Sequence, residues 1–117
     1  MLEQQHARSP TFGEARLDAL QRHSFEYFLR ETNATNGLVA DRSQPGSPAS
    51  IAAVGFALAA YPVAVERGWM TRTDALARTL AVLRFFWGSP QGTAPAATGH
   101  KGFYYHFLDM LTGQRAG

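Results

Sequence analysis

The segment Phe103-Tyr-Tyr-His-Phe-Leu-Asp109 combines aromatic rings, an imidazole and a carboxylate in one short run. Its residue types favour a β-strand, on which successive side chains point to opposite faces. One face of that strand would hold Phe103, Tyr105 and Phe107, and the other Tyr104, His106 and Leu108. The first face could then pack against the protein while the second presents a hydroxyl and an imidazole to a cleft.

This arrangement suits a sugar, because the C–H faces of a sugar ring stack on aromatic side chains while its hydroxyls bond to carboxylates. Tyr104, His106 and Asp109 are therefore candidate binding residues, and Lys101 lies at the other end of the segment. A hairpin that merely covers neighbouring helices fits the same residues equally well. The residue types alone leave both interpretations open.

A second candidate pair, Asp41-Arg42, lies in a loop ahead of the most apolar stretch of the chain. Adjacent opposite charges most often brace a loop, and we expect this to be their main role. The same loop would open onto one end of a helical barrel, where ligands commonly bind. Asp41 and Arg42 therefore join the candidate binding residues.

The histidines near the C-terminal end do not make a convincing metal site. On a strand, His106 and Asp109 would point to opposite faces, and no second cluster of ligands accompanies them. The chain has no cysteine, which excludes disulfides and zinc–thiolate sites. We expect neither a metal nor another cofactor.

Hydrolysis of a glycosidic bond usually requires two carboxyl groups about 5 to 9.5 Å apart. Only Asp41 and Asp109 fall in loop or strand settings with aromatic residues nearby, since the other acidic residues fit helix faces, ends or caps. The catalytic residues stay unassigned, and the chain is expected to be an incomplete catalyst.

These residues must be positioned by helices, and the sequence predicts three, over residues 14–32, 48–66 and 72–87. The first and third have an apolar stripe opposite a charged face, as surface helices do. The second is apolar on every side from Ala52 to Val65 apart from Tyr61, so it predicts a buried helix that starts at Ser47-Pro48. A chain of this length cannot easily surround such a helix.

Two loops and a short β-hairpin complete the expected architecture. Asn33, Asn36 and Gly37 predict a turn after the first helix, and Gly68 and Thr71 mark the junction of the second and third. Residues 88–102 read as a long loop, and residues 103–113 as a hairpin truncated in its second strand. The predicted class is all-α, with three main helices plus this hairpin.

The overall composition gives few further clues. The chain of 117 residues has 11 basic and 9 acidic residues and no basic cluster, so we expect no nucleic-acid partner. The longest apolar run is shorter than a membrane span and contains Pro62, so no membrane association is expected. The first residues lack the pattern of a signal peptide. The compartment cannot be assigned from these residues.

Four stretches taken together resemble the bacterial glucoamylase-like domain, a family of endo-β-1,2-glucanases and a domain of cyclic β-1,2-glucan synthases. They are the loop Gly37-Leu-Val-Ala-Asp-Arg42, the run from Ala49 to Trp69, Leu83-Arg-Phe-Phe-Trp87, and the segment from Gly102 to Gly113. The resemblance covers about residues 14–117, with residues 1–13 as a flexible lead-in.

This resemblance implies an (α/α)6 toroid of which the chain is the N-terminal part, with residues 48–66 as an inner helix and 14–32 and 72–87 as outer helices. It implies a glucan substrate, hydrolysis of β-1,2-glucan by the parent enzyme, and a parent that is often exported. Asp41, Arg42, Tyr104, His106 and Asp109 would lie at or near the sugar cleft. The chain alone would be inactive, and its partner would be the remainder of the barrel. The alternative is a self-standing helical module that self-associates through residues 48–66.

Overall fold

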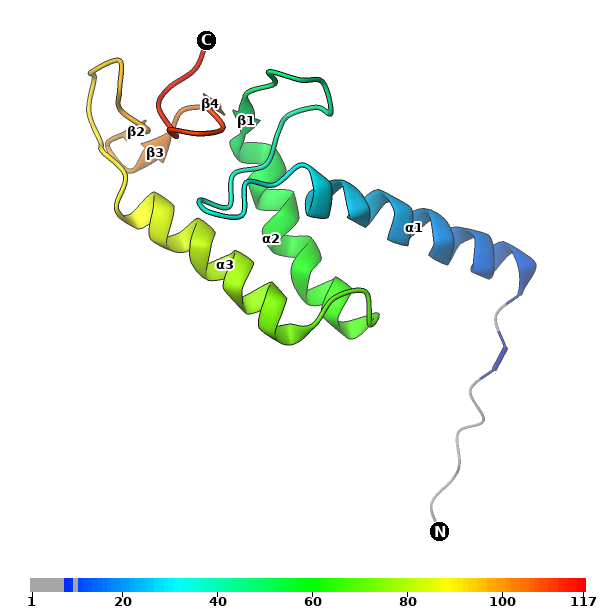
Figure 1. Ribbon diagram of the computed structural model, residues 1–117. Helices are drawn as coiled ribbons and strands as arrows, with labels where there is room; N and C mark the ends of the chain where they lie inside the picture. Colours follow the sequence, from blue (N-terminus) through cyan, green and yellow to red (C-terminus); the bar gives the residue numbers. More distant parts are fainter. Residues whose placement is uncertain (1–7, 10) are drawn as a thin grey trace.

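The computed structural model describes residues 8, 9 and 11–117 (Figure 1). Most of the predicted lead-in therefore lies outside the described residues. The three predicted helices are confirmed as α1 (Phe12–Arg30), α2 (Ile51–Glu66) and α3 (Arg72–Trp87). Four strands of two residues each accompany them, β1 (Ala49–Ser50), β2 (Gly99–His100), β3 (Phe103–Tyr104) and β4 (Phe107–Leu108). In the part of the chain described, no helix is both long and apolar enough to span a bilayer.

Helix α1 begins two residues earlier than expected because Thr11 forms its N-cap. The Thr11 side chain accepts from the backbone N–H of Glu14, and the Glu14 carboxylate accepts from the backbone N–H of Thr11. This reciprocal arrangement satisfies two N–H groups that would otherwise lack partners. The helix ends at Arg30, just before the predicted turn, where Gly37 adopts a φ of +76°.

The predicted start of α2 at Ser47-Pro48 is wrong, since Ser50 caps the helix through a bond from Ala53 N–H. Ala49 and Ser50 are instead drawn into β1, which pairs antiparallel with β4. Pro48 serves the preceding loop, because its carbonyl accepts from the backbone N–H of Asp41 at 2.8 Å. Pairing of these two residues with β4 and with the preceding loop thus overrides the local capping signal.

Among the described residues, only one face of α2 is covered. Val54, Ala57, Tyr61 and Ala64 form a buried stripe at helical spacing. On other parts of the helix surface, Phe56 is 69% exposed and Val63 is 51% exposed. The sequence correctly indicated that no face of this helix is polar, but the other two helices do not cover it all round.

Helices α2 and α3 form the predicted helical hairpin. Gly68 ends α2 with a φ of +73°, and the backbone N–H of Trp69 donates to Ala64 O at 2.8 Å. Thr71 then caps α3 by accepting from the backbone N–H of Asp74. Helix α1 joins this pair through the ring of Phe25, which packs against Tyr61 and Trp69.

The aromatic segment does not form one continuous strand. β3 pairs with β2 across a turn at Lys101 and Gly102, both with positive φ, whereas β4 pairs with β1. After the predicted turn near residues 110–113, Arg115 returns opposite Leu108 as an isolated bridge. The strict alternation of faces expected for residues 103–108 is therefore lost, because the chain changes partner between β3 and β4.

Candidate functional site

The five candidate binding residues lie at one end of the helical hairpin. This end carries all four strands, the N-terminus of α2 and the C-terminus of α3, while the junction between α2 and α3 lies at the opposite end (Figure 1). The β1–β4 pairing joins the loop of residues 41–48 to the segment that contains His106 and Asp109. Residues far apart in sequence thus meet around the start of α2.

Asp41 and Arg42 begin a loop that is held together by contacts among its own residues. Arg42 Nε lies 3.6 Å from Asp41 Oδ2, and the backbone N–H of Arg42 donates to Ser47 Oγ. Nearby, the Tyr27 hydroxyl donates to Ala40 O. Burial, together with the carboxylates of Glu31 and Asp41, raises the pKa of Tyr27, so this hydroxyl stays protonated as a donor.

The side chain of His106 is exposed to solvent, while its backbone carbonyl accepts a hydrogen bond within the fold. Its carbonyl accepts from the N–H of Ile51 at 3.0 Å, which satisfies the first helical N–H of α2. Its ring packs edge-on against Phe107 with centroids 4.3 Å apart. The imidazole is therefore exposed beside the N-terminus of α2.

Asp109 braces the turn that follows β4. Its Oδ1 accepts from the backbone N–H groups of Leu111 and Thr112, at 2.9 and 2.8 Å, and from the Thr112 hydroxyl at 3.1 Å. The N–H of Thr112, then that of Leu111, holds the pKa of Asp109 below its ordinary value of 3.8. Asp109 is thus ionised near neutral pH, with Oδ1 committed to the turn.

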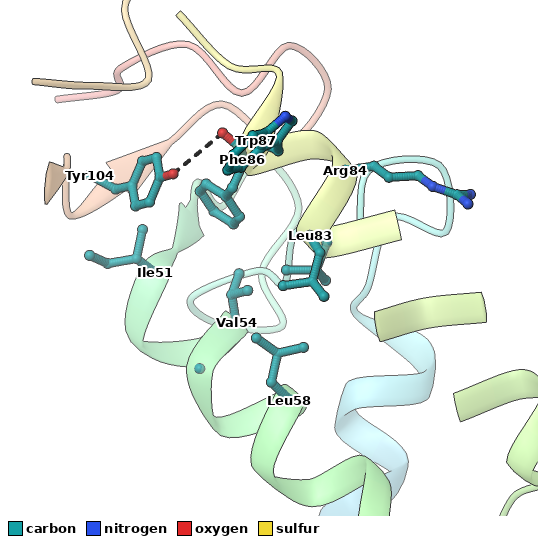
Figure 2. A pocket seen from close by; sticks show the side chains of 10 residues that line it. Ile51, Val54, Leu58, Leu83, Arg84, Phe86, Trp87 and Tyr104 are labelled. Atoms are coloured by element: carbon teal, nitrogen blue, oxygen red, sulfur yellow. Dashed lines mark hydrogen bonds between the residues drawn. The ribbon is translucent and has the colours of Figure 1, made fainter. Parts of the chain in front are cut away.

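Tyr104 lies against the C-terminal end of α3. Its ring packs on Phe86 with centroids 4.5 Å apart, and its hydroxyl donates to Phe86 O at 3.3 Å. Figure 2 shows it above an apolar groove of about 760 Å³ between α2 and α3. Ile51, Val54 and Leu58 line this groove from α2, and Leu83, Phe86 and Trp87 from α3. Phe103, expected to pack against the protein, is 80% exposed, and Leu108, expected to face a cleft, is buried.

A second cavity, here called the loop cavity, occupies about 810 Å³ where the 43–48 loop meets the turn after β4. Its lining residues are Glu31, Ala40, Ser43, Gln44, Pro45, Gly46, Ser47, Pro48, Asp109, Met110, Leu111, Ala116 and Gly117. The side-chain amides of Asn33 and Asn36 hold its wall together by donating to Met110 O at 3.0 and 3.1 Å. Asp109 is the one candidate binding residue in this lining.

Sequence reasoning missed Glu31, which it assigned to a helix end. The structure places Glu31 in the loop cavity, on the same lining as Asp109. The turn formers Asn33, Asn36 and Gly37 indicate that the chain reverses after α1, which would bring Glu31 beside the next loop. Its approach to the turn after β4 depends on contacts between residues more than seventy positions apart, such as Asn36 with Met110.

Across residues 8, 9 and 11–117, no group of three or more acidic or histidine side chains is arranged to hold a metal ion. The side chains of the cavity lining include two carboxyl groups, those of Glu31 and Asp109. Asp109 is already bonded to its own turn, so its low pKa makes it a poor proton donor. The geometry supports binding by these groups more readily than acid catalysis.

A comparison with known protein families finds no match. Among characterised proteins, the chain is 31% identical over 107 residues to an exo-β-1,2-glucooligosaccharide sophorohydrolase (non-reducing end) from Parabacteroides distasonis. The match covers 90% of this chain but only 14% of that relative.

Solved structures of similar fold also match nearly the whole of this chain. A glucoamylase-like protein from Bacteroides uniformis has a TM-score of 0.74 at 26% identity, with 93% of this chain and 25% of that chain covered. An endo-β-1,2-glucanase from Chitinophaga pinensis, solved with sophorotriose and glucose, has a TM-score of 0.67 at 20% identity. It shares the fold over 89% of this chain and 25% of its own. The predicted resemblance is therefore confirmed, and the chain has the fold of part of a glucoamylase-like helical toroid.

Proposed function

We propose that the chain is part of a glycoside hydrolase that acts on β-1,2-glucan and that it supplies one side of the sugar cleft. The observation that carries this proposal is the match to a sophorohydrolase across nearly the whole chain, over a small fraction of that relative's length. A match of this extent supports a shared substrate class. It also supports the view that this chain corresponds to one part of a longer domain.

In this proposal, Asp41, Arg42, Tyr104, His106 and Asp109 bind or support the glucan. The strands and loops that carry them lie at one end of the helices (Figure 1). This supports the assignment, since ligands of helical barrels bind among the loops of one end. The exposed imidazole of His106 offers a hydrogen-bonding group, while Asp109 shapes the turn beside it. Helix α2 would be an inner helix of the toroid, and α1 and α3 outer helices.

The chain alone is expected to be inactive, and the remainder of the barrel would be its partner. Within the described residues, part of the apolar surface of α2 is uncovered, and no two carboxylates are identified as an acid and base pair. The test is release of reducing sugar from β-1,2-glucan. We expect none from the 117-residue chain and measurable release from a version extended through a complete barrel. An extended, folded version that binds and cleaves no glucan would refute the proposed substrate.

A second candidate function is a helical module that self-associates through residues 48–66. The exposure of Phe56 and Val63 on α2 favours it, because monomeric proteins rarely leave a large apolar patch uncovered. A discrete dimer that melts cooperatively would support this module, whereas irregular association supports an incomplete barrel.

A further inference from the structure

The loop cavity has the mixed lining that a sugar ring requires. Pro45, Pro48, Met110 and Leu111 supply apolar surface, while Ser43, Gln44 and Glu31 supply polar side chains. The groove between α2 and α3 differs, since its lining is almost entirely aliphatic and aromatic (Figure 2). A pyranose also combines apolar C–H faces with a rim of hydroxyls, so it matches the loop cavity better than the groove.

The hydrogen bonds already made within the cavity show which polar groups are available. Ser47 Oγ accepts from Arg42 N–H and donates to Pro48 O, and Asp109 Oδ1 accepts three bonds from its own turn. By contrast, the structure gives the Glu31 carboxylate no hydrogen bond or ion pair with any described residue. The Gln44 side chain is likewise unbonded within the described part of the chain.

Glu31 is half-buried, and its backbone is fixed on both sides. Its N–H donates to Tyr27 O at 2.8 Å, and its carbonyl accepts from Ala40 N–H at 3.0 Å. A carboxylate held on the rigid end of α1 loses little further freedom when it accepts a bond from a ligand.

We propose that the loop cavity binds one neutral glucosyl unit, with the Glu31 carboxylate accepting hydrogen bonds from its hydroxyls and Gln44 bonding to another. This inference rests on the proposed function and adds a subsite to it. Among the described residues, no lysine, arginine or histidine lines the cavity, while Glu31 and Asp109 both do. These side-chain carboxylates, with no side-chain cation beside them, repel anions, so the cavity selects neutral sugars over sugar phosphates and uronic acids.

The experiment is an NMR titration with sophorose, the β-1,2-linked glucose disaccharide, of the 15N-labelled 117-residue chain at a concentration where light scattering shows a single chain. Glu31→Gln keeps the side-chain shape and removes the charge, and we expect it to weaken binding about tenfold, the cost of a charge-assisted bond. Glu66→Gln is the matched control, because Glu66 is exposed at the far end of α2. The affinity of this variant for sophorose should equal that of the unchanged chain.

A second variant, Gln44→Ala, guards against a folding defect in Glu31→Gln. Gln44 is exposed, and its side chain makes no bond within the described residues, so the variant should fold normally and bind about fivefold more weakly. A titration with glucose 6-phosphate should shift no cavity resonance.

Sophorose binding that neither variant weakens would overturn the glucosyl subsite and leave the proposed function standing. Glucose 6-phosphate binding in the cavity would overturn the selection for neutral sugars. Failure of the unchanged chain to bind sophorose at all would overturn the subsite, whereas the proposed function is decided separately by release of reducing sugar from β-1,2-glucan by the extended version.

Discussion

The Asp109 side chain stabilises the local backbone within a candidate binding site. Its three bonds hold the turn that carries Met110 and Leu111 into the wall of the loop cavity. The sequence identified it as a candidate ligand, whereas the structure shows that Oδ1 already serves its own turn. A contribution to sugar binding would therefore come from the other oxygen or from the shape of the turn.

The lowered pKa of Asp109 predicts a specific dependence of stability on pH. Because the folded protein favours the ionised carboxylate, its stabilisation is fully present above the ordinary pKa of 3.8 and is lost as pH falls through the folded value. Asp109→Asn should remove this dependence. Urea unfolding from pH ~6 to pH ~2 should show a difference between the two proteins that shrinks in acid. A difference that stays constant with pH would contradict this role.

The sequence indicated some residue roles better than others. Asp41 and Arg42 were expected mainly to brace their loop, and the structure places their charged groups 3.6 Å apart. Glu31 was not identified because nothing near it in sequence reports the distant turn that completes its cavity. A charge pair between adjacent residues can be predicted from the sequence. A cavity formed by segments more than seventy positions apart cannot be predicted in this way.

At the scale of elements, the connection between α1 and β1 is secured by a close contact with α3. Gly37 adopts a φ of +76°, and a Cβ added there would lie 2.2 Å from Val82 Cγ2 and 2.8 Å from Val82 N. The loop can pass α3 only because this position has no side chain. The turn was predicted from its residue types, but the contact with Val82 was not.

Gly37→Ala should therefore lower the free energy of unfolding by about 3 kcal/mol, from left-handed strain and overpacking together. Gly46 is a matched control, since its φ is +79° and no atom lies within 4 Å of an added Cβ. Gly46→Ala should cost only about 1 kcal/mol, from backbone strain alone. Urea unfolding of both variants measures the contrast, and equal losses would show that contact with Val82 is unimportant.

The helices were far more predictable than the strands. The bounds of α3 agree with the expected residues 72–87, because its apolar spacing, Thr71 cap and Gly88 end act locally. The two-residue strands carry no periodic signal, and β1 is paired with β4 while Ala49 is also bridged to Ala40 in the preceding loop. These pairings displace the expected start of α2, and neither is visible in the sequence around the helix.

The whole molecule is open, as expected of part of a larger fold. Its radius of gyration is 17.7 Å and its extents are 63 × 33 × 21 Å. A compact domain of this length would have a radius of about 13 Å. Trp87 at the end of α3 is 93% exposed, and Phe56 on α2 is 69% exposed. The prediction that so short a chain cannot surround its most apolar helix is confirmed by these exposed side chains.

The sequence predicted that α2 has no polar face, but it did not predict which segments cover the helix. A helix without a polar face must be buried in the complete protein, yet its neighbours can come from the same chain or from another copy. The comparisons favour the same chain, because the solved relatives are about four times as long as the segment they share with it. An incomplete barrel is the account that the structure and these relatives support together.

The central claim, that α2 lacks its natural neighbours, is tested most directly by light scattering of the size-separated chain. We expect a mass that rises with concentration without stopping at a defined oligomer, and less association in Phe56→Gln than in Phe103→Gln, a control that removes an exposed ring outside α2. A discrete dimer that melts in one cooperative transition would contradict the incomplete barrel and establish a self-associating module.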